Sequence, residues 1–301
     1  MLQKFDERNN NIKIFIKDRL YSREEAKVSV FDSSVQGGDA VWEGLRIYSG
    51  RIFCFDEHVK RLQESANTMM FYDIPSKEFI RKAVAETLKA NGMNDGAHIR
   101  LTLTRGEKIT SGMDPRLNTK GSCLIVLAEW KKPVYDNSSG IKLITSHIRR
   151  NSPVSLDSKI HHNNLINNIL AKIEANLSEA DDSVMLDLNG FVSETNATNI
   201  FLIKNGIVHT PNADSCLPGI TRGIVIKIAS DLNLICRERN ISVSEFYNAD
   251  EVFTTGTMGE LTPVNEIDGR KVINRSGLNI LEKIKEAYKL KTEKDGEPFE
   301  L

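Results

Sequence analysis

Apolar residues follow two different periods along this chain. Short alternating runs in residues 11–31 and again in residues 41–55 are typical of strands. Apolar positions recur every three or four residues in 56–69, where Asp56 is placed to cap the start, and again in 79–88. We therefore expect a sheet in the first part of the chain with two helices packed on it.

The pattern continues with further strands, helices and tight turns. Alternation at 98–106 and the apolar run 123–127 predict two more strands, and residues 36–39 predict a turn. Two Asn-Gly pairs, Asn189-Gly190 and Asn205-Gly206, predict tight hairpins. In the second half the pattern predicts a strand at 251–254 and helices at 165–173, 221–232 and 278–290.

A turn-rich, charged segment at residues 131–140 divides the chain into halves of domain size. With 301 residues the chain is long enough for two packed domains. The sequence predicts a small domain at 1–130, a linker at 131–140 and a larger domain at 141–301.

Charge and cysteine content exclude several classes of protein. The 40 Lys and Arg nearly balance the 41 Asp and Glu, so no overall basic field favours nucleic acid or an anionic membrane. The sequence shows neither a signal peptide nor the ~18 consecutive apolar residues of a membrane span. Its four cysteines show no CxxC spacing and predict reduced core thiols in a cytoplasmic protein. His161-His162 has no third ligand at a suitable spacing, so we predict no metal site.

Three kinds of residue point to a pyridoxal 5'-phosphate site. Lys159 offers an amine for a Schiff base, and Glu194 offers a carboxylate for a ring nitrogen. The turn at 217–222 opens a helix, and residues 255–259 can form a second nest of backbone amides, so both suit a phosphate. Taken singly each feature has an ordinary interpretation, such as Thr221 acting only as a helix N-cap.

The motifs taken together resemble those of class IV aminotransferases. They are Glu194-x-Asn196-x-x-Asn199-Ile200-Phe201, Val208-x-Thr210, Leu217-x-Gly219-Ile220-x-Arg222, Val41-Trp42-Glu43-Gly44-Leu45-Arg46, Glu57-His58-x-x-Arg61-Leu62, Ile99-Arg100, and Gly256-Thr257-x-x-Glu260-Leu261-Thr262-Pro263-Val264. The resemblance implies the α+β, two-domain fold type IV architecture, like that of D-amino acid aminotransferase. It has a small α/β domain and a larger barrel-like domain, and the family usually forms homodimers.

The resemblance also implies roles for individual residues. Lys159 would hold the cofactor as a Schiff base and then act as general base and acid, and Glu194 would bond the protonated pyridine nitrogen. The phosphate would be held by Arg61, Ile220, Thr221, Gly256 and Thr257. The alternative for Arg61 is an ordinary solvated arginine.

Substrate contacts follow less directly from the sequence. Trp42, Trp130 and Met258 would form an apolar wall for an aliphatic side chain, while Arg100 would either receive a carboxylate or organise the loop that does. The alternative is two core tryptophans and a structural arginine. Asn164 stands where branched-chain enzymes have a tyrosine, and it would donate to the cofactor's phenolic oxygen.

The resemblance is strongest to branched-chain amino acid aminotransferases. It implies an enzyme of the EC 2.6.1 type that moves an amino group from a branched-chain L-amino acid to 2-oxoglutarate by a ping-pong mechanism. Gly37, where another pocket tyrosine is common, and Asn164 keep a D-amino acid or (R)-amine transaminase open, and 4-amino-4-deoxychorismate lyase is a further alternative on this fold. The sequence also leaves open whether Arg149-Arg150 is a solvated pair or contacts a partner subunit.

Overall fold

The computed structural model describes residues 4–135 and 137–299, and its chain divides into two compact units. Of the described residues, 4–132, 160–164 and 292–299 form the N-terminal unit, and 133–135, 137–159 and 165–291 form the C-terminal unit. The chain first passes between units after Lys132, inside the expected linker 131–140, of which Asp136 lies outside the described residues. The domain limits 1–130 and 141–301 stay a prediction, because contacts alone do not test independent folding.

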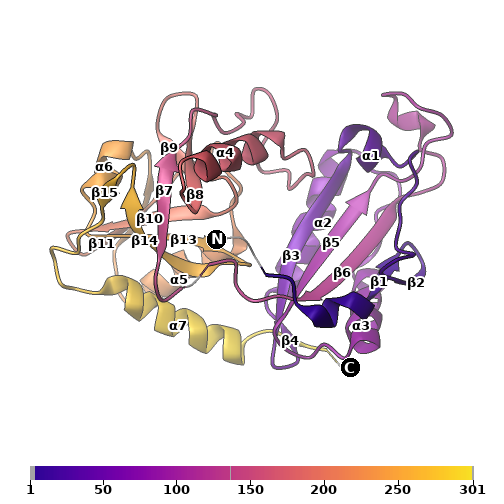
Figure 1. The fold of residues 1–301 in the computed structure, drawn as a ribbon, viewed down its shortest axis with the longest axis horizontal. Coiled ribbons are helices and arrows are strands. Elements are labelled where there is room, and N and C mark those ends of the chain that lie inside the picture. Colours follow the sequence, from indigo (N-terminus) through magenta and orange to yellow (C-terminus); the bar gives the residue numbers. More distant parts are fainter. Residues whose placement is uncertain (1–3, 136, 300–301) are drawn as a thin grey trace. The chain divides into compact units, whose positions relative to one another are not determined.

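The N-terminal unit is a seven-stranded antiparallel sheet with two helices on one face (Figure 1). The strand order is β16-β4-β3-β5-β6-β1-β2. Its elements are η1 (Glu7–Asn11), β1 (Lys13–Ile16), β2 (Arg19–Ser22), α1 (Ser33–Gly37), β3 (Ala40–Tyr48), β4 (Arg51–Ile52), α2 (Phe55–Thr68), α3 (Lys77–Asn91), β5 (Ala97–Thr104), η2 (Pro115–Leu117), β6 (Cys123–Trp130) and β16 (Glu297–Pro298).

The two helices on this sheet confirm the predicted periodicity. Their apolar faces, with Leu62 of α2 and Leu88 of α3 fully buried, pack with the strands in one core. Asp56 is not the cap that we expected, because α2 begins one residue earlier, after Cys54 in the left-handed conformation. Asp56 instead lies in the first turn, where a negative charge is favourable.

Two local predictions in this unit are wrong. Residues 36–39, expected as a turn, include the end of helix α1, which stops at Gly38 with φ of 66°. The alternating pattern of residues 11–31 forms strands only as far as Ser22. In the first case the Asp32 side chain caps α1 by accepting from the Ser34 N–H, which favours a short helix before Gly38. In the second case a local turn follows β2, with the N–H groups of Glu25 and Ala26 donating to the carbonyl of Ser22.

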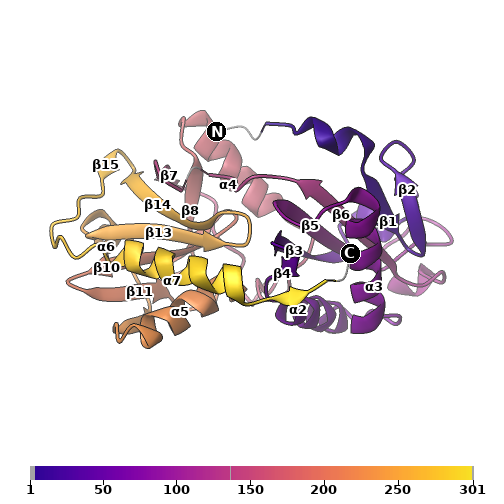
Figure 2. The same ribbon diagram turned by 90° about the horizontal axis from the view of Figure 1, so that it is seen from below.

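The C-terminal unit contains a nine-stranded mixed sheet of order β12-β11-β10-β13-β14-β7-β8-β9, with β15 added to β14. Strand β9 also contacts β10 and β11, so the sheet curls into a barrel-like form. Helices α5 and α7 lie side by side in both views (Figures 1 and 2). The elements are β7 (Ile141–Thr145), α4 (Ile166–Leu177), β8 (Asp182–Leu186), β9 (Val192–Thr195), β10 (Asn199–Lys204), β11 (Ile207–Pro211), α5 (Ile220–Asp231), β12 (Cys236–Arg239), α6 (Val243–Tyr247), β13 (Glu251–Gly256), β14 (Glu260–Ile267), β15 (Arg270–Lys271) and α7 (Ile280–Lys294).

Both predicted hairpins are present in this sheet. Asn205 and Gly206 have φ of 50° and 78° between β10 and β11, as a type I′ turn requires. Gly190, with φ of 84°, lies in the turn between β8 and β9. These turns determine where β9 and β10 begin and end, and therefore where their polar side chains lie.

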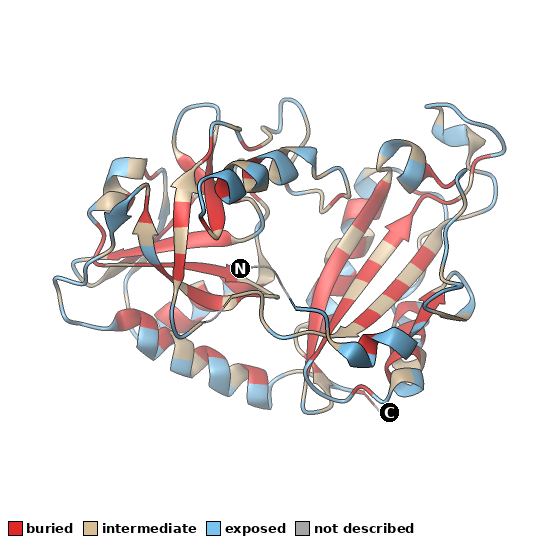
Figure 3. Cartoon of the chain, viewed as in Figure 1, coloured by how far each residue is buried: buried red, intermediate tan, exposed pale blue. Residues whose placement is uncertain are grey.

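Helix α4 is largely exposed along its length (Figure 3), and its exposed side chains include an apolar stripe. The stripe consists of Ile166, Ile169, Leu170, Ile173 and Leu177, which are between 42% and 82% exposed. Their spacing of three and four residues places them on one helix face. The helix was predicted correctly, and its apolar side is largely uncovered in this chain.

The cysteines differ from the expected core thiols. All four are free, but only Cys216 is buried, and Cys54, Cys123 and Cys236 are half-buried. Within the described residues, we find no helix whose length and apolar character would let it cross a membrane.

Candidate active site

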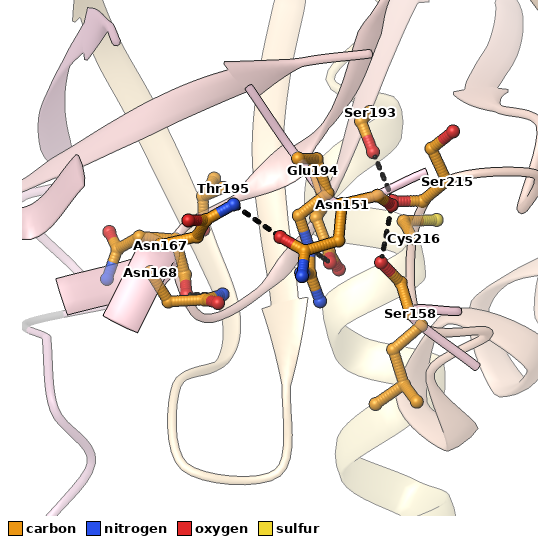
Figure 4. A network of polar contacts seen from close by, with 12 residues as sticks. Asn151, Ser158, Asn167, Asn168, Ser193, Glu194, Thr195, Ser215 and Cys216 are labelled. Carbon is orange, nitrogen blue, oxygen red and sulfur yellow. Dashed lines mark hydrogen bonds and ion pairs between the residues drawn. The ribbon is translucent and has the colours of Figure 1, made fainter. Parts of the chain in front are cut away.

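Lys159 ends a segment that leads directly into the N-terminal unit, since Ile160 already belongs to that unit. Its backbone N–H donates to Asp157 Oδ1 at 2.9 Å. The amine Nζ lies 3.4 Å from the carbonyl oxygen of Asp214, and the side chain is 46% exposed. Ser158, fully buried, donates through Oγ to the carbonyl of Asn151 (Figure 4). The backbone at Lys159 is thus fixed, while its amine remains accessible to a ligand.

Glu194 lies on β9 and is almost completely buried. Arg150 Nε donates to Glu194 Oε1 at 2.5 Å, and Asn199 Nδ2 donates to Oε2 at 3.1 Å. Burial raises the pKa of Glu194, although Arg150 and the backbone of Leu217 act in the opposite direction. The carboxylate therefore has a fixed orientation and one permanent cation beside it.

Asn199 connects this carboxylate to the turn that opens α5. Besides Glu194, its Nδ2 donates to the carbonyl oxygen of Leu217 at 2.9 Å. A Cβ atom at Gly219 would lie 2.1 Å from Asn199 Oδ1, which no side chain can tolerate without movement. Glycine is thus required at position 219 by this close approach.

The N-terminus of α5 is free of a side-chain cap, because its N-cap is Gly219. The expectation that Thr221 itself caps the helix is therefore wrong. Thr255 pairs with Asn199 across β13 and β10, so both side chains lie on one face of the sheet. Its Oγ1 is buried without a hydrogen-bond partner. Free backbone donors at a helix N-terminus and a nearby unsatisfied hydroxyl are donors that suit a phosphate, so this part of the chain fits the predicted cofactor.

Gly256 and Thr257 follow Thr255 at the end of β13, next in sequence to this donor set. A Cβ at Gly256 would lie 3.1 Å from Thr198 Cγ2, so a larger residue would crowd the strand. Ile220 and Thr221 occupy the first two positions of α5. The C-terminal unit thus brings four of the five predicted phosphate residues to the ends of two neighbouring elements.

Further polar contacts hold the loops around Glu194 in place (Figure 4). Ser193 Oγ donates to the carbonyl of Ser215 at 3.0 Å, and Asn168 Nδ2 donates to the carbonyl of Asn196 at 2.7 Å. Asn167 also donates to Asn151, next to Arg150. These contacts join β9 to the segment before α5, and they join α4 to the segment before Lys159 and to the residue that follows β9.

In the N-terminal unit, Arg61 is held by a buried carboxylate and is not an ordinary solvated arginine. Its Nε and Nη2 donate to the two oxygens of Glu43 at 2.7 and 2.8 Å. His58 and His161 contact the same carboxylate at 2.6 and 3.0 Å. Burial opposes the charge of Glu43, but His161, Arg61 and His58 outweigh it and hold its pKa well below the usual value. The orientation of the Arg61 guanidinium is therefore fixed.

Trp42 and Arg100 form one stack with His161. The guanidinium of Arg100 lies 4.0 Å from the centre of the Trp42 ring, and that ring lies 4.1 Å from the imidazole of His161. Trp42 Nε1 donates to the carbonyl of His162 at 3.2 Å. Asn164 follows, with its backbone N–H donating to His162 Nδ1 at 3.1 Å. The segment just after Lys159 is thus anchored to β3.

Trp130 lies away from this stack. On β5, Ala97 pairs with Trp130 and Thr102 pairs with Trp42, so the two tryptophans are displaced by five positions, or about 17 Å along the strand. Trp130 is in contact with Arg8, whose guanidinium is 4.8 Å from its ring. Met258, in the other unit, accepts through its carbonyl from the Val134 N–H. The N-terminal sheet therefore does not bring the two tryptophans together as one wall.

Two residues of this arrangement were missed by the sequence analysis as members of the site. Asn199 was part of the motif, but no role was assigned to it. Arg150 was left as a solvated residue or a contact of a partner subunit, and its buried ion pair with Glu194 shows that the first alternative is wrong. The only signal was its position nine residues before Lys159, which does not reveal a contact to residue 194.

The family is identified by a match over most of the chain. The model of the family described as amino-transferase class IV matches residues 40–267. The chain belongs to this family, as its motifs predicted, and the two-unit α+β fold with its barrel-like sheet is the fold type IV arrangement.

Particular relatives are similar over nearly the whole chain. Branched-chain-amino-acid aminotransferase-like protein 2 of Arabidopsis thaliana is 57% identical over 97% of this chain, and a putative branched-chain-amino-acid aminotransferase of Methanocaldococcus jannaschii is 40% identical over 92% of this chain and 96% of its own length. The chain spans only 52% of the Arabidopsis protein. Among solved structures, a branched-chain amino acid aminotransferase in complex with N-(5'-phosphopyridoxyl)-L-glutamate is similar with a TM-score of 0.86 and 31% identity, covering 94% of each chain.

Proposed function

We propose that this chain is a pyridoxal-phosphate-dependent aminotransferase that moves an amino group from a branched-chain L-amino acid to 2-oxoglutarate by a ping-pong mechanism. Family membership supports the enzyme class, and the phosphopyridoxyl complex of the similar solved enzyme supports the cofactor. The observation that carries the proposal is the buried Glu194, held between Arg150 and Asn199 next to the uncapped start of α5.

Each part of this arrangement has a task toward the cofactor. Glu194 would hold a proton on the pyridine nitrogen, and Lys159 would bind the cofactor and move the substrate proton. Ile220, Thr221, Gly256 and Thr257, together with Arg61 of the N-terminal unit, would hold the phosphate. When bound, the cofactor supplies the electron sink for the reaction.

The substrate residues are proposed on chemical grounds. Trp42 and Arg100 bring an apolar ring and a cation stacked on it to one place, which would suit an aliphatic side chain in one half-reaction and a carboxylate in the other. Trp130 and Met258 stay proposed contacts for the aliphatic group. Asn164 is proposed as the donor to the phenolic oxygen of the cofactor.

The test is formation of glutamate from 2-oxoglutarate with leucine, isoleucine or valine. Lys159→Ala should lower turnover by about 10²–10⁴-fold, because both the covalent attachment and the proton carrier are lost. Lys227→Ala, an exposed lysine of α5, is the matched control and should leave turnover unchanged. Full turnover by Lys159→Ala, or no transfer from any of the three amino acids, would refute the proposal.

The rival transaminases are separated by the amino donor. The observation that favours a D-amino acid or (R)-amine transaminase is Asn164, which stands where branched-chain enzymes have a tyrosine. Its backbone N–H donates to His162. Transfer from D-alanine or (R)-1-phenylethylamine, without transfer from L-leucine, would move the assignment to that class. Release of pyruvate without an amino acceptor would indicate the lyase.

We also propose a homodimer, with the apolar stripe of α4 as its contact. Single chains seldom expose so many neighbouring large apolar side chains, and a second copy can cover them through a twofold axis. Ile173→Glu should convert the dimer into monomers in light scattering, while Ile235→Glu, at a separate exposed isoleucine, should not. An Ile173→Glu protein that stays dimeric would exclude this contact. A cytoplasmic location is proposed from the free cysteines alone.

A further inference from the structure

Asp182 is a buried carboxyl group to which the proposed reaction gives no role. It is the first residue of β8 and is completely buried. Its Oδ1 accepts from the Ser183 N–H at 2.9 Å, and its Oδ2 accepts from Tyr135 Oη at 3.0 Å and from Thr195 Oγ1 at 3.2 Å. A buried charge is tolerated only when it is hydrogen-bonded, so these three donors stabilise the carboxylate.

The protonation states of these groups determine which of them donate. Burial raises the pKa of Asp182 to about 6, although the Ser183 N–H and Lys172 act in the opposite direction. Burial and the neighbouring Asp182 also raise the pKa of Tyr135, so the phenol keeps its proton. At pH 8 Asp182 is therefore ionised and can only accept, while Tyr135 and Thr195 both donate to it.

On one side, the contacts of Asp182 lead to the start of the loop between β13 and β14. Because the Thr195 hydroxyl donates to Asp182, Thr198 Oγ1 must be the donor in its bond of 2.7 Å to Thr195 Oγ1. The Thr198 N–H also donates to Thr195 Oγ1, at 2.9 Å. The methyl group of Thr198 lies beside Gly256, where an added Cβ would come within 3.1 Å of Cγ2. Asp182 thus orients the side chains that support Gly256.

On the other side, Tyr135 leads from Asp182 to the end of the same loop. Tyr135 Cδ2 lies 3.6 Å from the position that a Cβ of Gly259 would take, so the ring stands beside this glycine. The neighbouring Val134 N–H donates to the carbonyl of Met258 at 3.1 Å. Residues 256–259 are therefore supported at both ends, and both supports are hydrogen-bonded to one carboxylate.

We propose that Asp182 is a positioning residue for the loop of residues 256–259, which it holds from both ends through its two hydroxyl partners. The inference rests on the proposed function, in which Gly256 and Thr257 of this loop hold the cofactor phosphate. Asp182 needs no contact with the cofactor for this role. Backbone donors that are already arranged bind an anion more tightly, because the loop need not be ordered on binding.

The test compares how tightly the full chain, freed of cofactor, binds pyridoxal 5'-phosphate and pyridoxal at pH 8, by titration followed by absorbance. The ratio of the two dissociation constants measures the preference for the phosphate. Each free ligand is the same for every variant, so a change in this ratio reports the protein alone. A residue that positions the phosphate loop should change the ratio, whereas a residue that only stabilises the fold should affect both ligands alike.

Two variants remove the contacts of Asp182 to different extents. Asp182→Asn has one acceptor oxygen in place of two, so it leaves either the Ser183 N–H or the two hydroxyls without an acceptor. We expect it to lower the preference for the phosphate about tenfold or more. Tyr135→Phe keeps the ring and removes only its hydroxyl, and it should lower the preference about threefold or more. If Asp182→Asn does not fold, Tyr135→Phe decides.

Asp268 provides matched controls in the same unit. It accepts from the same three kinds of donor, the Thr145 N–H and Oγ1, both at 2.6 Å, and Tyr247 Oη at 2.7 Å. Asp268 follows the last residue of β14, whereas the loop of residues 256–259 precedes the first one. Asp268→Asn and Tyr247→Phe should therefore leave the preference for the phosphate within about twofold of the wild type.

The outcomes separate this inference from the proposed function. A lowered preference in Asp182→Asn or Tyr135→Phe, with unchanged controls, supports the positioning role. A wild type without any preference for the phosphate would overturn the proposed phosphate site and this inference with it. A wild-type preference that both variants retain, or that the Asp268 and Tyr247 variants lower to the same extent, would overturn this inference alone.

Discussion

Replacing Arg150 by methionine should destabilise the protein because it removes the cation that is hydrogen-bonded to the buried carboxylate of Glu194. Both side chains are 7% exposed, and the pair is joined by a single short bond of 2.5 Å. Breaking a buried ion pair by removing one partner costs about 3–5 kcal/mol of unfolding free energy. Asn199 Nδ2 and the backbone of Leu217 still support Glu194, so we expect a value near the lower end at neutral pH.

The loss should depend on pH with a definite sign. Burial already raises the pKa of Glu194, and removal of Arg150 raises it further. A carboxyl whose pKa is higher in the folded state loses stability as pH rises from its unfolded value, about 4.3, to its folded value. The deficit of Arg150→Met should thus be small near pH 4, where Glu194 is protonated in both states, and full near pH 8.

The assay is urea unfolding of the apo-protein between pH 4 and pH 8, so that no cofactor nitrogen offers Glu194 a partner. The control is the double variant Arg150→Met with Glu194→Gln, which removes both charges. The double variant should recover most of the stability lost at pH 8 and show little pH dependence. Replacing both partners of a buried ion pair by uncharged side chains of similar size often leaves the unfolding free energy unchanged. A deficit of Arg150→Met that stays constant over this range, or a double variant no more stable than the single one, would refute this reasoning.

Two further variants test close contacts. Gly219→Ala should destabilise the protein by about 1–3 kcal/mol, since its Cβ would lie 2.1 Å from Asn199 Oδ1, whereas Gly223→Ala in the same helix meets nothing within 4 Å and should stabilise it by about 0.5–1 kcal/mol. Equal urea midpoints for Gly219→Ala and Gly223→Ala would contradict the close approach of Gly219 to Asn199. Glu43→Gln should cost about 3–5 kcal/mol at pH 7, because Arg61 loses its buried carboxylate. Because the pKa of Glu43 is lower in the folded protein, the stabilisation that ionised Glu43 provides is lost as the pH falls through that folded pKa. The difference in unfolding free energy between the wild type and Glu43→Gln should therefore shrink in acid, which urea unfolding at a series of pH values would measure.

Much of the fold follows from local patterns in the sequence. Helices α2 and α3 were predicted from periodicity alone, because one face of each is buried against the sheet. The turn at Asn205-Gly206 was predicted from residue types that tolerate positive φ. Such features depend on residues within one or two turns of chain and need no knowledge of the remaining structure.

Other features depend on contacts that the sequence does not display. The apolar stripe of α4 has the same period as a core helix, and the sequence cannot tell whether its cover comes from this chain or from another. The start of α2 after Cys54 is set by a left-handed residue, which a rule based on capping side chains misses. The placement of Trp130 depends on strand register, because a tryptophan is suitable for a core, a pocket or a surface stack.

The candidate site illustrates the same limit at the level of single contacts. Glu194 and Asn199 are five residues apart on neighbouring strands, and Asn199 reaches Gly219 through the turn before α5, so the motif lists side chains that really touch. Arg150 is 44 positions from the carboxylate that it neutralises, and no spacing rule connects them. Burial raises the pKa of Glu194 and Arg150 acts against it, so the motif identifies the acid but leaves out the cation that opposes the effect of burial.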